Sequence, residues 1–373
     1  MKSIKELATN GELKGKKVLL RLDLNVPIAD GTVTDDFRIK ASMDTLGLLH
    51  NSGARTIIIS HIEGKGGDSL MPVYEIISKI FPIKFVDDCM SDEVATAAEA
   101  LTDGEFVLLE NLRAHEGEKK NDPEFAEKLA NLADIYVNEA FPASHRAHAS
   151  IVGITKYIPG FAGIRFEQEV TELSTVFHPP HPFLFILGGA KFDTKLPLIE
   201  KFLKIADKIF IGGALANDCL KAKGFEVGQS VISSGEFDLT NIINNKKVVL
   251  PKDVVVERGG ERKTVAIGGV ESGDKIWDAG EETLKELKAI LNDSNFVLWN
   301  GPLGNYEIGY TEATVGLAKI IAESDINSVV GGGDTVASIR NLGIEDEFSF
   351  LSTGGGATLD FLVSEPVPGI EAL

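Results

Sequence analysis

The chain has 373 residues, which exceeds one ordinary domain of about 100–200 residues and suits two. Its composition, 43% hydrophobic and 25% charged, is typical of a soluble globular protein. The 37 Lys and Arg residues against 56 Asp and Glu residues give a formal net charge of −19, which argues against nucleic acid and anionic membranes as partners. Any anionic ligand must therefore be held by a local group of basic residues.

The remaining composition predicts a cytoplasmic protein. Cys89 and Cys219 are too few for a disulfide framework or a zinc cluster, so a reducing compartment is expected. No apolar run approaches the roughly 20 residues of a membrane span. The N-terminal residues also lack the apolar core of a signal peptide.

Short β-branched runs alternate with helix-like segments along the chain. The first series of predicted strands covers residues 17–21, 56–60, 84–86, 106–109 and 135–137. The second series covers residues 183–187, 208–211, 247–250, 295–299, 328–330 and 348–352. Helical patterns lie between them, for example at 123–131, 196–204 and 281–291. This alternation favours the α/β class with doubly wound parallel sheets, and continuous apolar strands suggest sheets covered on both faces.

A proline cluster at residues 178–182 separates the two series of strands. Before it, residues 161–177 are expected to form a helix that connects two lobes. We therefore expect an N-terminal lobe at 1–160 and a C-terminal lobe at 178–360. In doubly wound sheets, ligands bind beyond the carboxyl ends of the strands, so functional residues are expected just after each strand.

Polar and basic side chains follow the strands of the first half. Asp23 and Asn25 follow the first strand and His61 the second, although taken alone such a pair more often reflects turn chemistry and a lone histidine is more often structural. Four of the arginines lie at or beyond strand ends: Arg21, Arg38, Arg113 and Arg146. They form either an anion pocket or surface ion pairs, and their spacing alone does not decide between the two.

In the second half, five strands end in glycine-containing turns. Because glycine lets backbone amides approach a phosphate group, five such turns in one sheet indicate a nucleotide site. The turns include Lys191, Lys195 and the pair Asp334-Thr335, where Asp334 could hold Mg²⁺, cap a helix, or do both. Neither a Walker A sequence nor a dinucleotide-binding glycine fingerprint is present, which argues against a P-loop protein or a Rossmann dehydrogenase.

Eight segments in order resemble the phosphoglycerate kinase family along nearly the whole chain. They are Arg21-Leu-Asp-Leu-Asn-Val-Pro27, Phe37-Arg38-Ile39, Leu109-Glu-Asn-Leu-Arg113, His145-Arg-Ala-His-Ala-Ser150, Gly188-Gly-Ala-Lys191, Trp299-Asn-Gly-Pro302, Gly331-Gly-Gly-Asp-Thr335 and Ser352-Thr-Gly-Gly-Gly-Ala357. The resemblance implies two lobes facing a cleft, joined by a helix hinge, with residues 361–373 returning to the N-terminal lobe. It also implies a monomer that reversibly converts 1,3-bisphosphoglycerate and MgADP into 3-phosphoglycerate and MgATP.

The resemblance further implies the roles of individual residues. The substrate would be held by Arg21, Asp23, Asn25, Arg38, His61, Arg113 and Arg146. The nucleotide would be held by Gly189, Lys191, Lys195, Gly213, Asn300, Pro302, Glu307, Gly331, Gly332, Gly333, Asp334 and Thr335, with Asp334 as the Mg²⁺ ligand. The transferred group would be surrounded by Arg38, Lys195, Gly354, Gly355 and Gly356. Hinge closure would bring the two substrates together.

The chain departs from the family pattern after its second predicted strand. Ser60-His-Ile-Glu63-Gly64-Lys65 replaces Ser-His-Leu-Gly-Arg-Pro, so an arginine is missing and a carboxylate is added. We expect weaker 3-phosphoglycerate binding or a rearranged loop, with Lys65 as a partial substitute. The usual aromatic residue after Gly212-Gly213 is also absent, which makes phosphate binding a firmer prediction than adenine preference. The alternative function is that of a non-catalytic relative with the same fold, which binds a nucleotide or a metabolite.

Overall fold

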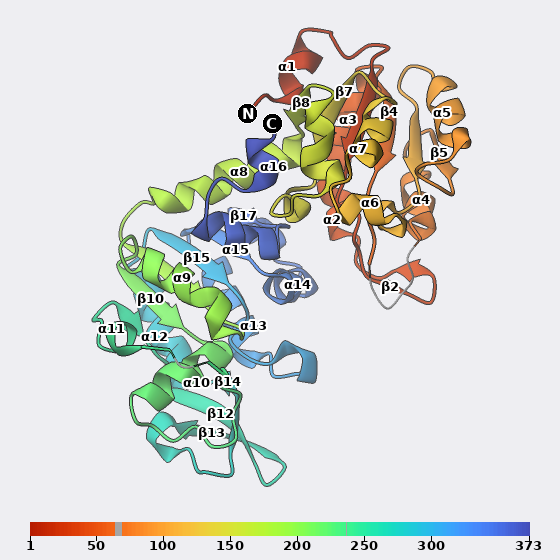
Figure 1. Ribbon diagram of the computed structural model, residues 1–373. Helices are drawn as coiled ribbons and strands as arrows, with labels where there is room; N and C mark the ends of the chain where they lie inside the picture. The colour runs from red at the N-terminus through yellow and green to blue at the C-terminus, as the bar shows by residue number, and fades with distance from the viewer. Residues whose placement is uncertain (64–68, 236) are drawn as a thin grey trace. The chain divides into compact units, whose positions relative to one another are not determined.

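The computed structural model describes residues 1–63, 69–235 and 237–373 (Figure 1). The chain divides into two compact units, Met1–Thr171 with Ser364–Leu373, and Glu172–Val363. The division falls within helix α8 (Ile164–Ser174). Each unit is an α/β fold with its own six-stranded parallel sheet, which confirms the predicted fold class. Within the described ranges, no helix is both long and apolar enough to cross a membrane.

The first unit is built around a parallel sheet with the strand order β5-β6-β4-β1-β7-β8. In that order the strands are Ile83–Val86, Phe106–Leu109, Arg55–Ile59, Lys17–Arg21, Ile135–Asn138 and Gly160–Ala162. The short strands β2 (Ile28–Ala29) and β3 (Thr32–Val33) form a separate hairpin. The helices of this unit are α1 (Ile4–Thr9), α2 (Phe37–Ala41), α3 (Met43–Asn51), α4 (Met71–Ile77), α5 (Asp92–Glu99), α6 (Glu116–Lys119), α7 (Pro123–Ala130), the first part of α8, and α16 (Pro368–Glu371).

Both faces of this sheet are covered, as the continuous apolar strands predict. Leu20 packs into one hydrophobic cluster with residues of α3 and α4, while Leu19 packs into another with residues of α5 and α7. Both leucines are fully buried. Burying such a side chain contributes about 1.5–3 kcal/mol to stability, so these two clusters make the sheet a rigid support for the residues at its edge.

The segment that connects the units differs from its prediction in one respect. Residues Gly160–Ala162 form strand β8, which pairs with β7 through Phe161 and Val137, so α8 begins later than predicted and is followed by a 3-10 turn at Thr175–Phe177. Pairing with a neighbouring strand outweighs the local helical pattern here. At the C-terminus, the Gly369 N–H donates to the Ser144 carbonyl at 2.8 Å, so the tail packs on the first unit.

The second unit has a parallel sheet with the strand order β11-β10-β9-β15-β16-β17. In that order the strands are Val248–Val249, Lys208–Ile211, Phe183–Leu187, Phe296–Asn300, Asn327–Gly331 and Phe350–Leu351. Its further helices are α9 (Phe192–Phe202), α10 (Gly213–Ala222), α11 (Thr240–Ile243), α12 (Glu281–Asn292), α13 (Glu312–Ala322), α14 (Gly333–Asn341) and α15 (Gly356–Val363).

The second unit also contains a small antiparallel sheet that the sequence did not predict. It comprises β13 (Glu261–Ala266), β12 (Asp253–Arg258) and β14 (Lys275–Ala279) in that order. The strand β13 is largely exposed and has no apolar run, so its sequence carries little strand signal. This sheet matters for the site, because β14 supplies Trp277 and Asp278 to the pocket that also contains Gly189, Gly213 and Asp334.

Candidate functional site

In the first unit, five of the seven predicted substrate residues lie at the carboxyl ends of three adjacent strands. Arg21 ends β1 and is followed by Asp23 and Asn25, while His61 follows β4 and Arg113 follows β6. Because β1, β4 and β6 are neighbours in the sheet, their ends meet at one edge. The fold therefore brings together residues that are up to 92 positions apart in the sequence, from Arg21 to Arg113.

Arg21 is the fixed centre of this group. Its side chain is fully buried, its Nε donates to Ser150 Oγ at 2.8 Å, and its Nη2 lies 2.9 Å from His61 Nδ1. Ser150 Oγ in turn donates to Glu118 Oε1 at 2.6 Å, and Glu118 is also fully buried. The guanidinium charge is thus balanced by a buried carboxylate through one hydroxyl group, which fixes its orientation.

His61 is held in its neutral form. Burial lowers its pKa well below the usual value, and the positive charges of Arg21, Arg113 and Arg38 lower it further. A neutral ring accepts at Nδ1 from Arg21 and keeps an N–H at Nε2. The depressed pKa also reports that several basic groups converge on this edge of the sheet.

Arg38, from α2, is held next to Asp23 and Asn25. Its Nη1 lies 2.8 Å from Asp23 Oδ2 and donates to the Asn25 carbonyl at 3.1 Å. The side chain is 30% exposed, so it is anchored at one end and still accessible to a ligand. Asp23 is therefore both a turn residue, accepting from the Asn25 N–H, and an anchor for arginine.

Arg113 is engaged by a carboxylate of the same unit. Its Nη1 donates to Glu63 Oε2, and Lys119 Nζ lies 2.6 Å from Glu63 Oε1. The Glu63 N–H donates to Asn25 Oδ1 at 2.9 Å, so Glu63 contacts two of the predicted substrate residues. Arg146 is exposed and donates to His145 Nε2 at 3.1 Å. Lys65 lies outside the described residues.

In the second unit, the glycine-containing turns pack against one another at the carboxyl edge of the sheet. Gly213 has φ +60° and a Cβ there would lie 2.5 Å from the Gly189 nitrogen. Gly301 has φ +93° and a Cβ there would lie 2.5 Å from the Gly188 carbonyl oxygen. Only glycine permits these left-handed conformations and this close backbone approach, so the turns after β9, β10 and β15 form one surface of backbone atoms.

The two predicted lysines differ in their surroundings. Lys195, on α9, is 7% exposed and donates to the Gly188 carbonyl at 2.6 Å. Burial lowers its pKa to about 8. Lys191 is exposed and adopts a left-handed conformation, with φ 66°, immediately before α9.

A pocket of about 290 Å³ opens beside these turns. Its lining includes five of the predicted nucleotide residues: Gly189, Gly213, Pro302, Glu307 and Asp334. Mainly apolar side chains form another part of the lining: Ala216, Val254, Trp277 and Leu303. Among the described residues, buried Asn300 Nδ2, Thr335 Oγ1 and Trp277 Nε1 have no hydrogen-bond partner. Unsatisfied buried polar groups of this kind are expected where a ligand completes the hydrogen bonding.

The triple-glycine segments lie at the ends of β16 and β17. Gly331 ends β16, Gly332 has φ +98°, and Gly333 begins α14, whose first turn carries Asp334 and Thr335. After β17, Gly354 donates its N–H to Ser352 Oγ at 3.0 Å, Gly355 has φ +54°, and Gly356 begins α15. Desolvation, and then the Glu307 carboxylate, raises the pKa of Asp334.

Comparison with known proteins identifies this architecture. Residues 8–365 match the family model described as phosphoglycerate kinase. The chain is 41% identical to the phosphoglycerate kinase of Wolbachia sp. subsp. Drosophila simulans over 386 residues, covering 98% of this chain and 97% of the relative. The corresponding enzyme of Dictyoglomus turgidum is 39% identical over 383 residues, covering 97% and 96%. The chain belongs to the phosphoglycerate kinase family.

Solved phosphoglycerate kinases have the same fold. The structure from Pyrococcus horikoshii OT3 matches with a TM-score of 0.88 at 29% identity, covering 100% of this chain and 98% of that one. The structure from Coxiella burnetii matches with a TM-score of 0.84 at 32% identity, covering 99% and 98%. The predicted family, fold and activity are confirmed: the chain is a glycolytic kinase that transfers phosphate to a carboxyl group.

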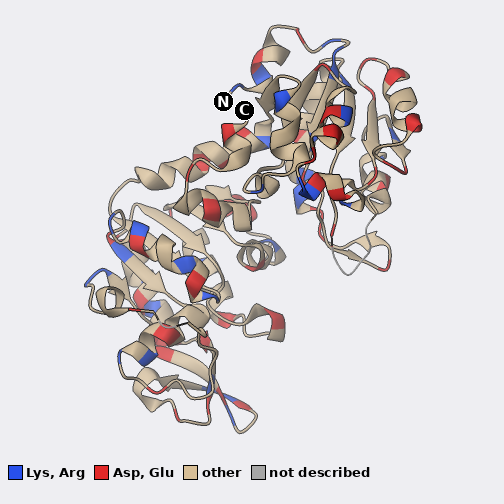
Figure 2. Ribbon diagram, in the orientation of Figure 1, with Lys and Arg blue, Asp and Glu red and all other residues tan. Residues whose placement is uncertain are grey.

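The sequence did not predict the residues that orient the candidate substrate residues. Glu118 and Ser150 orient Arg21. Glu63, which the sequence showed as an added carboxylate, pairs with Arg113. Ser150 ends one of the motifs, but a role in orienting Arg21 is visible only once residues 129 positions apart are in contact. Trp277 also lies in the pocket wall, on a strand that the sequence did not predict. Asp and Glu positions are distributed along both units, in keeping with the net charge of −19 (Figure 2).

Proposed function

We propose that this chain transfers a phosphoryl group reversibly from 1,3-bisphosphoglycerate to ADP, with 3-phosphoglycerate and ATP as products. The glycerate substrate binds at the carboxyl edge of the first sheet. There Arg21, Arg38, Arg113 and Arg146 supply positive charge, and Asp23, Asn25 and His61 supply hydrogen bonds. The observation that carries this proposal is the convergence of these groups on one edge, since the chain as a whole repels anions.

The nucleotide binds in the pocket of the second unit. Its base and ribose contact the apolar wall, which includes Val254, Pro302 and Leu303. Its phosphates are held by the amides of the glycine turns, by Lys191 and Lys195, and by Thr335 at the start of α14. Glu307 adds a polar group to the lining, and Asn300 is proposed to contact the nucleotide from the end of β15. The unpartnered buried groups Asn300 Nδ2 and Thr335 Oγ1 support this assignment within the described residues.

The transfer itself needs positioning and charge stabilisation rather than a general base. An oxygen of the ADP β-phosphate attacks the phosphorus of the acyl phosphate, the bond from phosphorus to the carboxylate oxygen breaks, and 3-phosphoglycerate leaves as a carboxylate. Arg38, Lys195 and the amides of Gly354, Gly355 and Gly356 stabilise the charge spread over the moving group. Since the two substrates bind to different units, hinge-bending closure is part of the proposal.

The metal proposed for this reaction is Mg²⁺, held by Asp334. Mg²⁺ binds through one or two carboxylates together with substrate phosphates, and the nearby carboxylates of Asp334 and Glu307 make the donor set suitable. When bound, the ion would neutralise part of the negative charge on the nucleotide phosphates. An Asp334→Asn variant should need a higher Mg²⁺ concentration for half-maximal activity, and an unchanged requirement would remove Asp334 from this role. We further propose that the enzyme acts as a cytoplasmic monomer, in keeping with its two buried free cysteines.

A coupled assay for ATP formation from 1,3-bisphosphoglycerate and ADP tests the proposed sites. Arg38→Ala should lower kcat by about 10²–10³, the usual cost of removing a group that stabilises transition-state charge. Arg55→Ala is the matched control, because Arg55 lies at the amino end of β4 and pairs with Asp103 at 3.0 Å. Equal activities of the two variants would contradict the assigned role of Arg38. Nucleotide binding without any turnover by the wild-type chain would favour a non-catalytic binding protein.

A further inference from the structure

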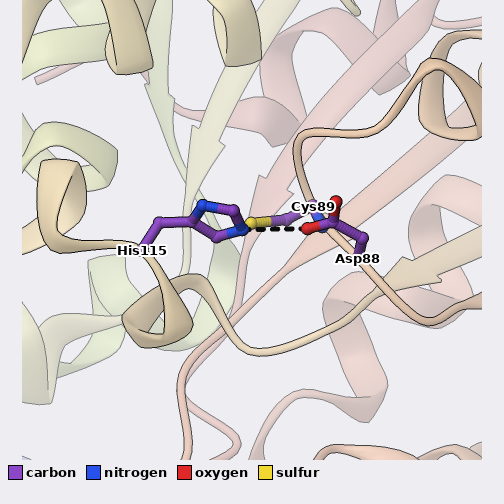
Figure 3. Close-up of side chains that lie close together, drawn as sticks. All are labelled: Asp88, Cys89 and His115. Carbon is purple, nitrogen blue, oxygen red and sulfur yellow. Dashed lines mark hydrogen bonds and ion pairs between the residues drawn. The ribbon is translucent and has the colours of Figure 1, made fainter.

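A second cluster of ligand-type side chains lies in the first unit. Asp88 and Cys89 lie between β5 and α5, and His115 directly precedes α6. One oxygen, sulfur or nitrogen atom from each residue lies within 4.8 Å of the other two, with the sulfur and the carboxylate both beside the imidazole ring (Figure 3). In the part of the chain that the structure describes, this is the one such cluster of at least three His, Cys, Asp or Glu residues.

The spacing of the three atoms suits a tetrahedral metal ion. Ligand atoms around zinc, with bonds of about 2.0–2.3 Å, lie about 3.3–3.8 Å apart. Here His115 Nε2 and Asp88 Oδ1 are 2.8 Å apart, and all separations are at most 4.8 Å. The Asp88–His115 separation is therefore shorter than a shared ion requires, and no separation exceeds 4.8 Å, so binding requires this hydrogen bond to open.

Two of the ligands are already oriented by their neighbours. Asp88 Oδ1 accepts hydrogen bonds from the Cys89 N–H at 2.6 Å and the Met90 N–H at 3.2 Å. The His115 ring packs against Phe125, with ring centroids 5.9 Å apart. Outer contacts of this kind fix the orientation of metal ligands and reduce the entropy lost on binding.

The charges around Cys89 favour a cation. Cys89 is 2% exposed, and the Asp88 carboxylate lies beside its sulfur. A dication would offset the negative charge of this carboxylate, and binding would replace the S–H bond by a sulfur–metal bond and release the proton to solvent. The Asp88 and His115 side chains are 36% and 35% exposed, which leaves an open side for entry and for a water ligand.

We propose that Asp88, Cys89 and His115 form a Zn²⁺ site, with water as the fourth ligand. Thiolate and imidazole ligands select zinc over Mg²⁺ and Ca²⁺, which prefer oxygen alone. The site is independent of the kinase reaction, because none of its ligands belongs to the proposed substrate or nucleotide residues. Bound zinc would tie the segment before α5 to the segment before α6 and so stabilise the first unit by mass action.

Titration of the reduced full-length chain with Co²⁺, a spectroscopic substitute for Zn²⁺, tests this proposal. Excess Mg²⁺ is present throughout to saturate the carboxylate at the nucleotide pocket. We expect a sulfur-to-cobalt charge-transfer band that Zn²⁺ abolishes by displacement, and a higher Tm with Zn²⁺. Cys89→Ser should lose the band, whereas Cys219→Ser should keep it, because Cys219 is the other buried cysteine and lies in the second unit.

His115→Asn provides a second test that leaves Cys89 in place should Cys89→Ser fold poorly. Loss of a residue that only hydrogen-bonds to a metal ligand lowers metal affinity by about 10–100-fold. Because His115 is proposed as a ligand itself, the variant should weaken Co²⁺ binding by more than this. Its kinase activity in the coupled assay should remain near that of the wild type. Absence of the band from the wild-type chain, or a band that survives Cys89→Ser, would overturn the proposal. Unchanged Co²⁺ affinity in His115→Asn would also overturn the proposal. The cluster would then be an ordinary hydrogen bond between Asp88 and His115 beside a buried thiol.

Discussion

The Glu63 carboxylate accepts a hydrogen bond from Arg113 Nη1, a group proposed to bind the glycerate substrate. Lys119 Nζ lies 2.6 Å from the other oxygen of the same carboxylate. Although partial burial acts to raise the pKa of Glu63, its contacts with Lys119 and Arg113 lower it overall. A carboxylate of the protein is thus paired with an arginine that we propose binds the substrate, so on this proposal the substrate must compete with Glu63 for Arg113.

Replacing Glu63 with glutamine should therefore lower the KM for 3-phosphoglycerate. The amide keeps the size of the side chain and the backbone contact with Asn25 but removes the charge that holds Arg113. Glu63 is 41% exposed, so its ion pair is screened and contributes about 1 kcal/mol, which corresponds to about a fivefold change in KM. Steady-state kinetics of ATP consumption at varied 3-phosphoglycerate measures this change.

Glu116→Gln is the matched control for that measurement. Glu116 is an exposed glutamate of the same unit whose ion pair is with Lys120, four residues along the chain. Its KM should match the wild-type value. If Glu63→Gln leaves KM unchanged or raises it, Glu63 does not compete with the substrate for Arg113.

The activity should fall as the pH rises through about 8, because burial lowers the pKa of Lys195 to about 8 in the free enzyme. The lysine is charged below this pH and loses its positive charge above it, and the proposed mechanism needs that charge. The profile of kcat/KM against pH reports the free enzyme, so its alkaline limb should show this pKa.

Lys195→Met tests the assignment of that limb. The variant should retain about 10⁻²–10⁻³ of the wild-type kcat, and its residual activity should no longer decline near pH 8. Lys204 is an exposed lysine just beyond the end of α9. Its variant Lys204→Ala should keep both the wild-type kcat and the decline of kcat/KM near pH 8. A limb that persists in Lys195→Met would have to arise from another group.

The strands of the two large sheets were predictable because their residues form continuous apolar runs. The predicted ranges 17–21 and 183–187 coincide with β1 and β9. The sheet β12–β14 was not predictable in this way, because β13 is mostly exposed and acquires its structure by pairing with β12. Strand β8 depends in the same way on pairing with β7.

The candidate site was only partly predictable for a related reason. Residues that directly follow parallel strands lie at the same edge of the sheet. The proximity of Arg21, His61 and Arg113 could therefore be predicted once their strands were assigned to one parallel sheet. The partner of each charge depends on loop paths that periodicity does not specify. For this reason the pair Glu63–Arg113 and the contact of Glu118 with Ser150, 32 residues away, emerged only from the structure.

Ser150 should position Arg21 for substrate binding. Ser150→Ala removes the acceptor for Arg21 Nε and the hydroxyl donor to Glu118, which leaves two buried charges each one partner short. The expected cost is about 1–3 kcal/mol in the free energy of unfolding, measured by denaturant titration. The KM for 3-phosphoglycerate should also rise several-fold while the KM for ATP stays unchanged.

Ser144→Ala separates this positioning role from general loss of stability. Ser144 is also a buried serine, and its hydroxyl donates to the Ala140 carbonyl rather than to the Arg21 network. Its variant should lose stability without a change in the KM for 3-phosphoglycerate. Parallel changes in that KM for both variants would mean that Ser150 acts only through overall stability.

Glu139 should make the stability of the protein depend on pH at the start of α8. Its carboxylate is buried and accepts from the N–H groups of Arg165 and Phe166, each at 3.0 Å, and from the Thr45 hydroxyl. Burial outweighs these hydrogen bonds and raises the pKa of Glu139 from 4.5 to about 7. The folded state therefore binds the proton more tightly than the unfolded state does.

The sign of the dependence follows from this raised pKa. The contribution of protonated Glu139 is fully present below pH 4.5 and is lost as the pH rises through about 7. At about 1.4 kcal/mol per pKa unit, the loss is on the order of 3 kcal/mol. Urea denaturation at pH 5.5 and pH 8.0 measures about 2 kcal/mol of this loss, because pH 5.5 lies above the unfolded pKa of 4.5. Glu139→Gln, which cannot ionise, should reduce the difference between the two pH values.

Glu124→Gln is the control for this last experiment, because Glu124 is an exposed glutamate in the first turn of α7. It should keep the full wild-type difference between the two pH values. Asp278 in the second unit also has a pKa raised by burial to about 7, so Glu139→Gln should remove only part of the difference and Asp278→Asn a further part. A difference that Glu139→Gln leaves intact would show that Glu139 is ionised in the folded protein at both pH values, with its charge stabilised by the amides of α8.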